Sequence, residues 1–554
     1  MKKTKVIIIA LLLIIIAVVG CVLGYQYMNK EKDTEDVATE KKEEKQEEKK
    51  ETKKMSEYQI DEGLSNFDLS FLKMENQKEN LVYSPLSIKY ALGMLEEAAE
   101  GDAKEEISNI LSSYKVKDYT NSKNMSFGNA LFVRDTFDVK KEYKSLLQEK
   151  YNADVITDSF ESADTINSWI SDKTLKLIEN LVTDDDVKSL NFALVNALGI
   201  DMEWRTKFLS NDRDYDKDKN LKLDCDYEHI NNTWWQTPAE VRSHEFENIN
   251  DKVSGMEIYA TLNNYDIMNE LGEDKIRETV TEEFMKWAKN EGKEYTDTFN
   301  GDYSDENIKK VAKEYLEGTD NNDSWLTQDG YLKELDSNYK DVSYSTDFSL
   351  YVDDEVKMFA KDLKEYDGTT LEYIAIMPTE EELDKFIEDI NVEEIKDLIG
   401  NLKELKSENF NDGVITEITG YIPKFKFDYD LDLMEDLNKM GIAAVFEQGK
   451  AELTNLTEDE DTYISDAKHK ANIEFTQDGI KASAVTMAGG MGAGEFFDYV
   501  FEVPIEKIDL TFDKPYMFLI RDKETGEVWF AGNVYEPLLW EDDQTVPDYL
   551  RVEY

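Results

Sequence analysis

Apolar residues follow helix and strand spacing in two stretches of the chain, and a polar stretch separates them. The patterned stretches are residues 57–208 and 346–554. Residues 209–345 are richer in Asp, Asn and Lys, and they lack long apolar runs except for a helix-like stretch at 274–288. Because both flanking stretches carry the apolar repeat of a packed core, we expect one large domain that is interrupted by a long insertion.

Several elements within the two stretches can be predicted from their spacing. Ser84-Pro85 is a typical helix start, because a serine hydroxyl can cap the helix and proline fits its first position. The apolar residues between 88 and 95 then recur at helical spacing. Residues 192–200 (FALVNALGI) and 371–378 (LEYIAIMP) are almost continuously apolar. This is the pattern expected of strands that are buried on both faces.

The first 27 residues have the composition of a signal or an anchor. Three lysines within the first five residues precede an apolar run at 6–24, as in an export signal. Residues 18–21 (VVGC) resemble a bacterial lipobox, in which Cys21 is lipidated and becomes the new N-terminus. The alternative is an uncleaved single-span anchor, because about 19 apolar residues can cross a bilayer. Both interpretations place the rest of the chain outside the cytoplasm, tethered to the membrane.

Composition narrows the choice of partners. Residues 28–56 form a charged, low-complexity linker that has too few apolar side chains to fold by itself. The whole chain carries 121 acidic and 64 basic residues, a net charge of −57. Such a field repels phosphate backbones and anionic lipid, so we expect no nucleic-acid partner, and membrane contact only through the N-terminal anchor. Two cysteines cannot build a disulfide framework.

Motifs of catalysis and metal binding are weak. Four aspartates alternate within 212–218, but an EF-hand would need glycine at Lys217 and a carboxylate at Leu223. Four glycines within 489–494 lack the Lys-Ser/Thr of a phosphate-binding loop. The three histidines and Cys225 accompany no nucleophile motif. We therefore expect no metal, no cofactor and no enzymatic activity.

Residues 480–491 alternate in a way that suits a strand. One set of alternate positions is small or apolar, the other is mixed, and no proline interrupts them. The small set comprises Ile480, Ala482, Ala484, Thr486, Ala488 and Gly490. Such a segment could enter an existing sheet, although a flexible surface loop rich in glycine and alanine is the alternative.

Short motifs in the N-terminal stretch resemble those of the serpin family. They are NLVYSPLSI at 80–88, NALF at 129–132, and Asn196, Trp204 and Phe208 at eight- and four-residue spacing. Motifs in the C-terminal stretch continue in the family's order. They are PKF at 423–425, Met440-Gly441 with Phe446, His469-Lys470-Ala471 with Glu474 and Gly479, and the closing set Pro515, Phe518, Arg521, Thr525-Gly526, Phe530, Gly532, Val534 and Pro537.

The resemblance implies a fold and a set of site residues. It implies an α+β fold in which a helix cluster packs over three β-sheets, with a mobile reactive-centre loop near 477–505. The residues at the serpin shutter, which is a hydrogen-bonded cluster across the main sheet, are Ser84, Ser87, Asn196 and His469, and Trp204 is at the breach, where the loop would first enter. The loop hinge comprises Gly479, Ile480, Ala482, Ser483 and Ala484.

The resemblance also implies a function. A serine protease or, alternatively, a cysteine protease would attack the loop, and the cleaved loop would then insert into the main sheet of a monomeric inhibitor. Counting from Gly479 as in the family puts the cleaved bond at Ala493–Gly494, but the loop is longer than usual, so any bond within 491–499 stays open. Ile480 stands where serpins prefer threonine or serine. Two alternatives are a non-inhibitory binding protein and an adhesion protein that uses the 209–345 insertion.

Overall fold

The computed structural model describes most of the chain beyond the linker. The described residues are 57–205, 213–215, 221–223, 241–247, 249, 253–272, 299–316, 347–476, 479–480 and 504–537, with single positions and pairs between 274 and 289. All of them lie in the second of the two units into which the chain divides, residues 55–554. Cys21, the N-terminal anchor and the linker up to residue 56 lie outside the described residues.

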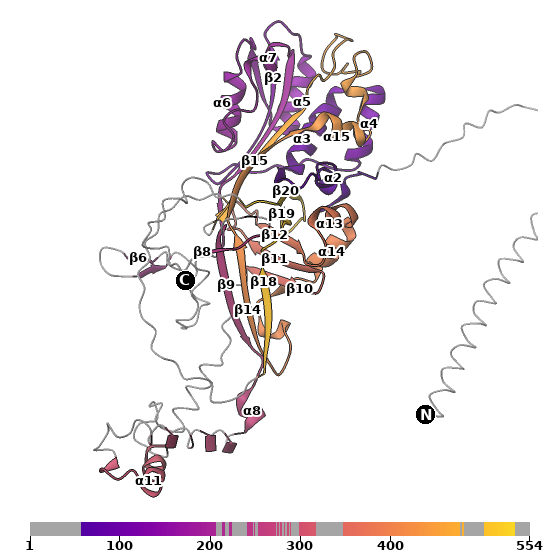
Figure 1. Cartoon of the computed structure of the whole chain (residues 1–554). Helices are drawn as coiled ribbons and strands as arrows, with labels where there is room; N and C mark the ends of the chain where they lie inside the picture. The colour runs from indigo at the N-terminus through magenta and orange to yellow at the C-terminus, as the bar shows by residue number, and fades with distance from the viewer. Residues whose placement is uncertain are drawn as a thin grey trace, which may run out of the picture. The chain divides into compact units, whose positions relative to one another are not determined.

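A seven-stranded sheet forms the centre of the core (Figure 1). Its order is β1 (Leu81–Tyr83), β20 (Val528–Val534), β19 (Tyr516–Asp522), β12 (Leu371–Pro378), β11 (Val356–Asp362), β10 (Phe348–Val352) and β13 (Lys403–Glu404). Every residue of β12 is buried, as its continuous apolar run predicts. The two ends of the domain meet here, because β1 pairs with β20 along its whole length.

A second sheet joins the polar stretch to the C-terminal stretch. Its order is β18 (Ile505–Thr511), β14 (Ile415–Pro423), β9 (Val253–Asn263) and β8 (Val241–His244). Strands β8 and β9 belong to the stretch 209–345 that we assigned to an insertion. This part of the stretch therefore completes a sheet of the main body, while the insertion's boundaries stay a prediction.

Two smaller sheets are linked by the chain, and we treat them together as the two parts of a third sheet. One part has the order β3 (Asp154–Asp158), β2 (Met125–Arg134) and β4 (Phe192–Ile200). The other has the order β15 (Phe425–Asp432), β16 (Lys468–Phe475), β17 (Gly479–Ile480) and β5 (Met202–Glu203). Only Asp201 separates β4 from β5, so the chain crosses from one part to the other at this point. The smaller hairpin of β6 (Arg213–Tyr215) and β7 (Leu221–Leu223) stands apart.

Helix α3 (Pro85–Ala98) runs through the core. Its N-cap is Ser84 and proline occupies its first turn, as the sequence predicts. The other described helices are α2 (Asn66–Met74), α4 (Gly101–Leu111), α5 (Lys141–Tyr151), α6 (Asp164–Lys173), α7 (Asp184–Lys188), α8 (Ile267–Leu271), α11 (Asp305–Leu316), α13 (Leu383–Asp389), α14 (Val392–Gly400) and α15 (Leu433–Lys439). The expectation of an α+β fold with helices and several sheets is confirmed.

A buried ion cluster fixes α3 against its neighbours. The Lys89 Nζ atom lies 2.7 Å from Asp68 Oδ1 of α2 and 3.1 Å from Glu527 Oε1, which precedes β20. The side chains of Lys89 and Asp68 have no exposed surface. Because unpaired charges are costly in a core, these contacts hold the three elements in one arrangement. The apolar spacing around residue 89 gives no sign of a buried charge.

Candidate functional site

The candidate site is the seam between β4 and β16. In the described part of the chain, no strand pairing joins these two strands directly. They are connected at one end by the two-residue strand β17, in which Ile480 pairs with Phe475 of β16 and with Met202 of β5. The first two residues of the predicted hinge therefore already occupy a strand position in the third sheet.

Gly479 fits this position because its neighbours leave no room for a side chain. A Cβ atom on Gly479 would lie 2.2 Å from the Met202 carbonyl oxygen. Ile480, the next residue, is buried, so its β-branched side chain packs inward at the head of the seam. An isoleucine, where serpins prefer threonine or serine, is accommodated here by an apolar environment.

Trp204 packs beside this junction, at the predicted breach. It is fully buried, and its Nε1–H donates a hydrogen bond of 2.8 Å to the Thr476 carbonyl oxygen. Its ring lies 5.3 Å from that of Phe475, and the ammonium of Lys361 lies 5.9 Å from its centre. The Thr476 N–H in turn donates to the Gly479 carbonyl oxygen at 3.0 Å. The tryptophan therefore holds the turn that leads from β16 into β17.

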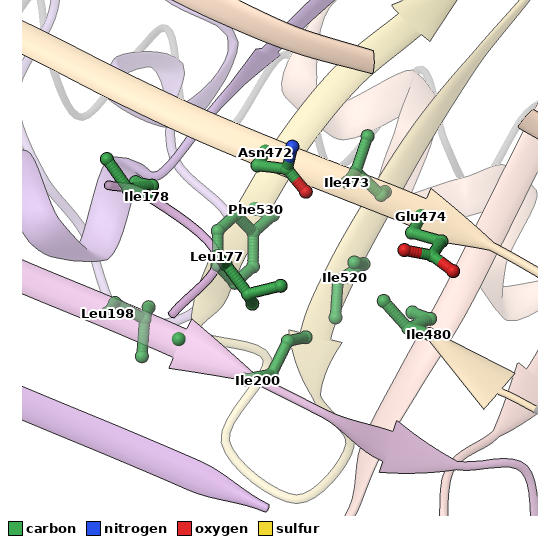
Figure 2. A pocket seen from close by; sticks show the side chains of 11 residues that line it. Leu177, Ile178, Leu198, Ile200, Asn472, Ile473, Glu474, Ile480, Ile520 and Phe530 are labelled. Atoms are coloured by element: carbon green, nitrogen blue, oxygen red, sulfur yellow. The ribbon is translucent and has the colours of Figure 1, made fainter. Parts of the chain in front are cut away.

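Beyond Ile480 the seam contains a cavity (Figure 2). Figure 2 shows Leu198 and Ile200 on one side, Ile473 and Glu474 on the other, and Ile520 and Phe530 between them. The cavity has a volume of about 20 Å³, and a space of roughly 10–15 Å³ already holds a water molecule. Its lining is largely apolar, so a small apolar side chain would suit it better than a charge.

Two further cavities follow the same pair of strands. The next has a volume of about 40 Å³ and is lined by Ser84, Ser87, Asn196 and His469. A larger one of about 380 Å³ lies between the first residues of β4 and the α3 and α15 helices. Among the described residues, open space therefore follows the seam from Ile480 to the start of β4.

The structure brings the four predicted shutter residues together around the second cavity. The Ser84 N–H donates to His469 Nε2 at 2.9 Å, and the Ser84 Oγ atom accepts from the Ser87 N–H at 3.1 Å. Asn196 is bonded within its own part of the sheet, because its Nδ2 donates to Asn129 Oδ1 of β2 at 2.7 Å. The buried Asn196 Oδ1 accepts no hydrogen bond from the described residues.

The protonation state of His469 follows from its surroundings. Burial lowers the pKa of the His469 imidazole to about 4, so the ring is neutral at pH 7. Because Nε2 accepts the Ser84 hydrogen bond, the proton is on Nδ1. The residue is only partly buried by surface area. The lowered pKa is due to burial, because the protein groups around the ring replace the water that would stabilise an imidazolium.

Three residues of this site were not predicted as site residues. They are Asn129, Thr476 and Lys361, which contact Asn196 and Trp204. Asn129 stands in a motif that the sequence already singles out, but its partner depends on the register of β2 against β4. The predicted hinge residues Ala482, Ser483 and Ala484, and the predicted reactive bond Ala493–Gly494, lie outside the described residues.

Neither a metal site nor a membrane span is found in the part of the chain that the structure describes. No three histidine, cysteine, aspartate or glutamate side chains there are grouped so that they could bind a metal ion. No described helix has both the length and the apolar character needed to cross a bilayer.

Comparison with known proteins adds a family and a fold. The family model for serpins (serine protease inhibitors) matches residues 64–219 and 338–537. Neuroserpin of Mus musculus is 22% identical over 488 residues, which cover 84% of this chain and 88% of that protein. A serpin-like protein of Methanosarcina acetivorans is 21% identical over 492 residues, covering 85% of this chain and 84% of that protein.

Two solved structures have a similar fold. Tengpin, a thermophilic serpin in its native state, matches with a TM-score of 0.51 and 19% identity, covering 85% of this chain and 92% of that one. Thyroxine-binding globulin in complex with thyroxine matches with a TM-score of 0.51 and 16% identity, covering 85% and 98%.

Proposed function

Because the chain belongs to the serpin family, we propose that it is a suicide inhibitor of serine proteases, with cysteine proteases as a second class of target. A protease cleaves the reactive loop and forms an acyl-enzyme, and the freed loop then inserts between β4 and β16. The observation that carries this proposal is β17, a two-residue strand at the head of a seam that no other described strand fills.

Two independent registers support insertion along the seam. Ile480 pairs with Met202 on one side and with Phe475 on the other, both antiparallel. If the pairing continues without a bulge, Thr486 comes to lie between Asn196 and His469. Those two residues line the same cavity, so the two registers agree. The inserted Thr486 hydroxyl would then be close to Asn196 Oδ1, a buried oxygen that accepts no hydrogen bond from the described residues.

The same register accounts for the alternation in the loop sequence. Ile480 faces inward, so the residues at even positions after it would face inward too. These are the small or apolar residues of the loop, and they would enter the narrow cavities of the seam. The chargeless face of the loop is therefore the face that insertion would bury.

The free energy expected from loop insertion is large enough to make insertion effectively irreversible. A strand from 481 to 493 would gain on the order of ten ladder hydrogen bonds, at ~1 kcal/mol net for each. It would also carry an attached protease roughly 40 Å, at ~3.3 Å per residue. Displacement of catalytic groups by ~1 Å can already cost about 100-fold in rate, so deacylation would stall. Strand addition of this kind is a general mode of recognition, of which serpin loop insertion is a known case.

A protease panel tests the proposal. The chain from residue 57 onward is incubated with chymotrypsin, elastase, subtilisin and papain, and the products are separated in SDS and mapped by mass spectrometry. We expect a covalent complex with at least one serine protease, with cleavage within 491–499. Clean cleavage by every protease, with no complex, would contradict inhibition and favour a non-inhibitory binding protein. That alternative has support in the fold, because one similar structure holds thyroxine.

We further propose that the protein acts outside the cytoplasm, anchored by its N-terminal segment. The support is the sequence of residues 1–27, with its basic flank, its apolar run and Cys21 in a lipobox-like setting. Metabolic labelling with a fatty acid, compared between the wild type and Cys21→Ala, separates the two forms of anchor. Label that depends on Cys21 indicates a lipoprotein, whereas unlabelled protein that stays with the membrane indicates a single span.

A further inference from the structure

The buried ion cluster on α3 contains three reactive groups that loop insertion does not use. Lys89 Nζ lies 2.7 Å from Asp68 Oδ1 and 3.1 Å from Glu527 Oε1. The side chains of Lys89 and Asp68 are fully buried, and that of Glu527 is 6% exposed. The Tyr114 ring covers the amine, with its centre 5.5 Å from Nζ. Because apolar residues often fill such a place equally well, stability alone does not account for the cluster.

The Asp68 carboxyl is held as an acyl acceptor is held in an enzyme. Its Oδ2 atom accepts hydrogen bonds from the Ser65 N–H at 2.8 Å and from the Ser65 hydroxyl at 2.7 Å. An oxyanion hole has its donors at about 2.7–3.1 Å from the oxygen on which charge develops. Burial raises the pKa of the Asp68 carboxyl. The raised pKa favours the neutral acid, which is the form that an amine can attack.

Lys89 supplies the amine. Burial acts to lower the pKa of Lys89, but attraction to Asp68 and Glu527 outweighs burial, so the pKa is raised and the chain folds with a charged cluster. A proton shift from Nζ to Asp68 across the 2.7 Å contact gives a neutral amine and a neutral acid. A core without water tolerates this neutral pair better than it tolerates separated ions. A desolvated neutral lysine is a nucleophile.

Glu527 is within reach as a general base. Its Oε1 atom accepts a hydrogen bond from Lys89 Nζ at 3.1 Å, inside the range of about 2.6–3.2 Å over which a proton is transferred directly. Its other oxygen, Oε2, lies 3.1 Å from the ammonium of Lys117. This contact favours the ionised carboxylate. Glu527 can therefore take a proton from Nζ and pass it to Asp68 Oδ1.

We propose that Lys89 and Asp68 condense after folding into an intramolecular isopeptide bond, with Glu527 as the proton carrier and Ser65 as the oxyanion hole. A C–N bond forms between Nζ and Asp68 Cγ, and the Cγ–Oδ1 bond breaks. Oδ1 leaves as water, with its own proton and one that Glu527 carries from Nζ. The step is a condensation, so it needs no oxidant and no cofactor. Well-oriented groups in one molecule react as if at about 10⁵–10⁸ M, which favours the amide.

The bond would join α2 to α3 and close a loop over residues 69–88. The two cysteines of the chain cannot build a disulfide framework. A cross-link between side chains would restrict the unfolded chain in the same way as a disulfide does. The inference is independent of loop insertion, so it stands whether or not the protein traps proteases.

Peptide mapping of the full-length protein by mass spectrometry tests the proposal. Trypsin does not cut after an acylated lysine, so the bond would join residues 55–73 to residues 79–104 in one branched peptide. We expect the mass of this peptide to be one water, about 18 Da, below the sum of its two linear parts. We also expect the fraction of branched peptide to rise as the purified protein ages. Wild-type protein that yields only the linear peptides after days at neutral pH would overturn the proposal.

Three variants assign the roles in samples of equal age. Glu527→Gln keeps the shape of the base but cannot accept the proton, so the branched fraction should fall at least about tenfold. Asp68→Asn should still give the same branched peptide, because ammonia replaces water as the leaving group. The matched control is Lys361→Met, which removes another buried lysine that lies 3.3 Å from an aspartate oxygen and should leave the branched fraction unchanged.

Two results would contradict the assigned roles. A branched peptide that joins Lys89 to the peptide of residue 527 would show that Glu527, and not Asp68, is the acyl partner. An undiminished branched fraction in Glu527→Gln would show that Glu527 does not carry the proton.

Discussion

Replacement of Ala484 by arginine should convert the inhibitor into a substrate. If the pairing of β17 continues, residue 484 lies between Leu198 and Ala471 and faces inward, toward the second cavity, whose lining includes no acidic side chain. A guanidinium there would be buried without a partner, at a cost of about 3–5 kcal/mol. Because ~1.4 kcal/mol corresponds to a factor of ten in rate, insertion beyond this residue should slow at least 100-fold.

The assay for Ala484→Arg is the stoichiometry of inhibition. A fixed amount of protease is titrated with the variant, and the ratio of complex to nicked protein is read from an SDS gel. We expect the number of inhibitor molecules consumed for each protease to rise at least about tenfold. The matched control is Val485→Arg, which the same register places on the outward face. Equal effects of the two variants, or a larger effect at 485, would refute the register.

Three further predictions concern single features of the site and core. Burial lowers the pKa of His469 to about 4 from its ordinary 6.5, so protonation favours the unfolded chain. The contribution of neutral His469 to the free energy of unfolding should be fully present above pH 6.5. It should decrease by at most about 3 kcal/mol as the pH falls from 6.5 to about 4. In urea unfolding, His469→Gln should lack this decrease in stability between pH 6.5 and about 4. The same pH dependence of stability in both proteins would contradict the lowered pKa of His469. Gly479→Val should expel β17, because its Cβ atom would lie 2.2 Å from the Met202 oxygen. Hydrogen exchange at Ile480 should then rise at least tenfold, and unchanged protection would count against this. Lys89→Met should destabilise the fold by about 3–5 kcal/mol, whereas adding Asp68→Leu should restore much of the loss. Urea midpoints that show no recovery in the double variant would argue against a charge effect.

The sequence predicts the core elements better than the contacts between them. The β12 and β4 strands follow from continuous apolar runs, and α3 follows from its capping serine and proline. In each case the signal is local. Burial on both faces of a strand, or capping at the start of a helix, dictates the residue types at a few consecutive positions. The shutter residues were grouped through family resemblance, since they come from segments far apart in the chain.

Other features depend on partners that no local pattern reveals. Strand β9 lies in a polar stretch, and its place in a sheet depends on its register with β14, far along the chain. The buried charge of Lys89 is acceptable only because Asp68 and Glu527 meet it. The Asn129 amide pairs with Asn196 because β2 and β4 are aligned in one register, which spacing alone does not specify.

Disulfide trapping tests most directly whether the cleaved loop becomes a strand of the third sheet. In a background with Cys21 and Cys225 changed to serine, Ala471→Cys is combined with Ala484→Cys, which the registers place directly opposite each other. We predict rapid cross-linking in loop-cleaved protein and little in intact protein, with Ala471→Cys/Val485→Cys as the out-of-register control. Cleaved protein that fails to cross-link, or that cross-links no faster than intact protein, would contradict insertion.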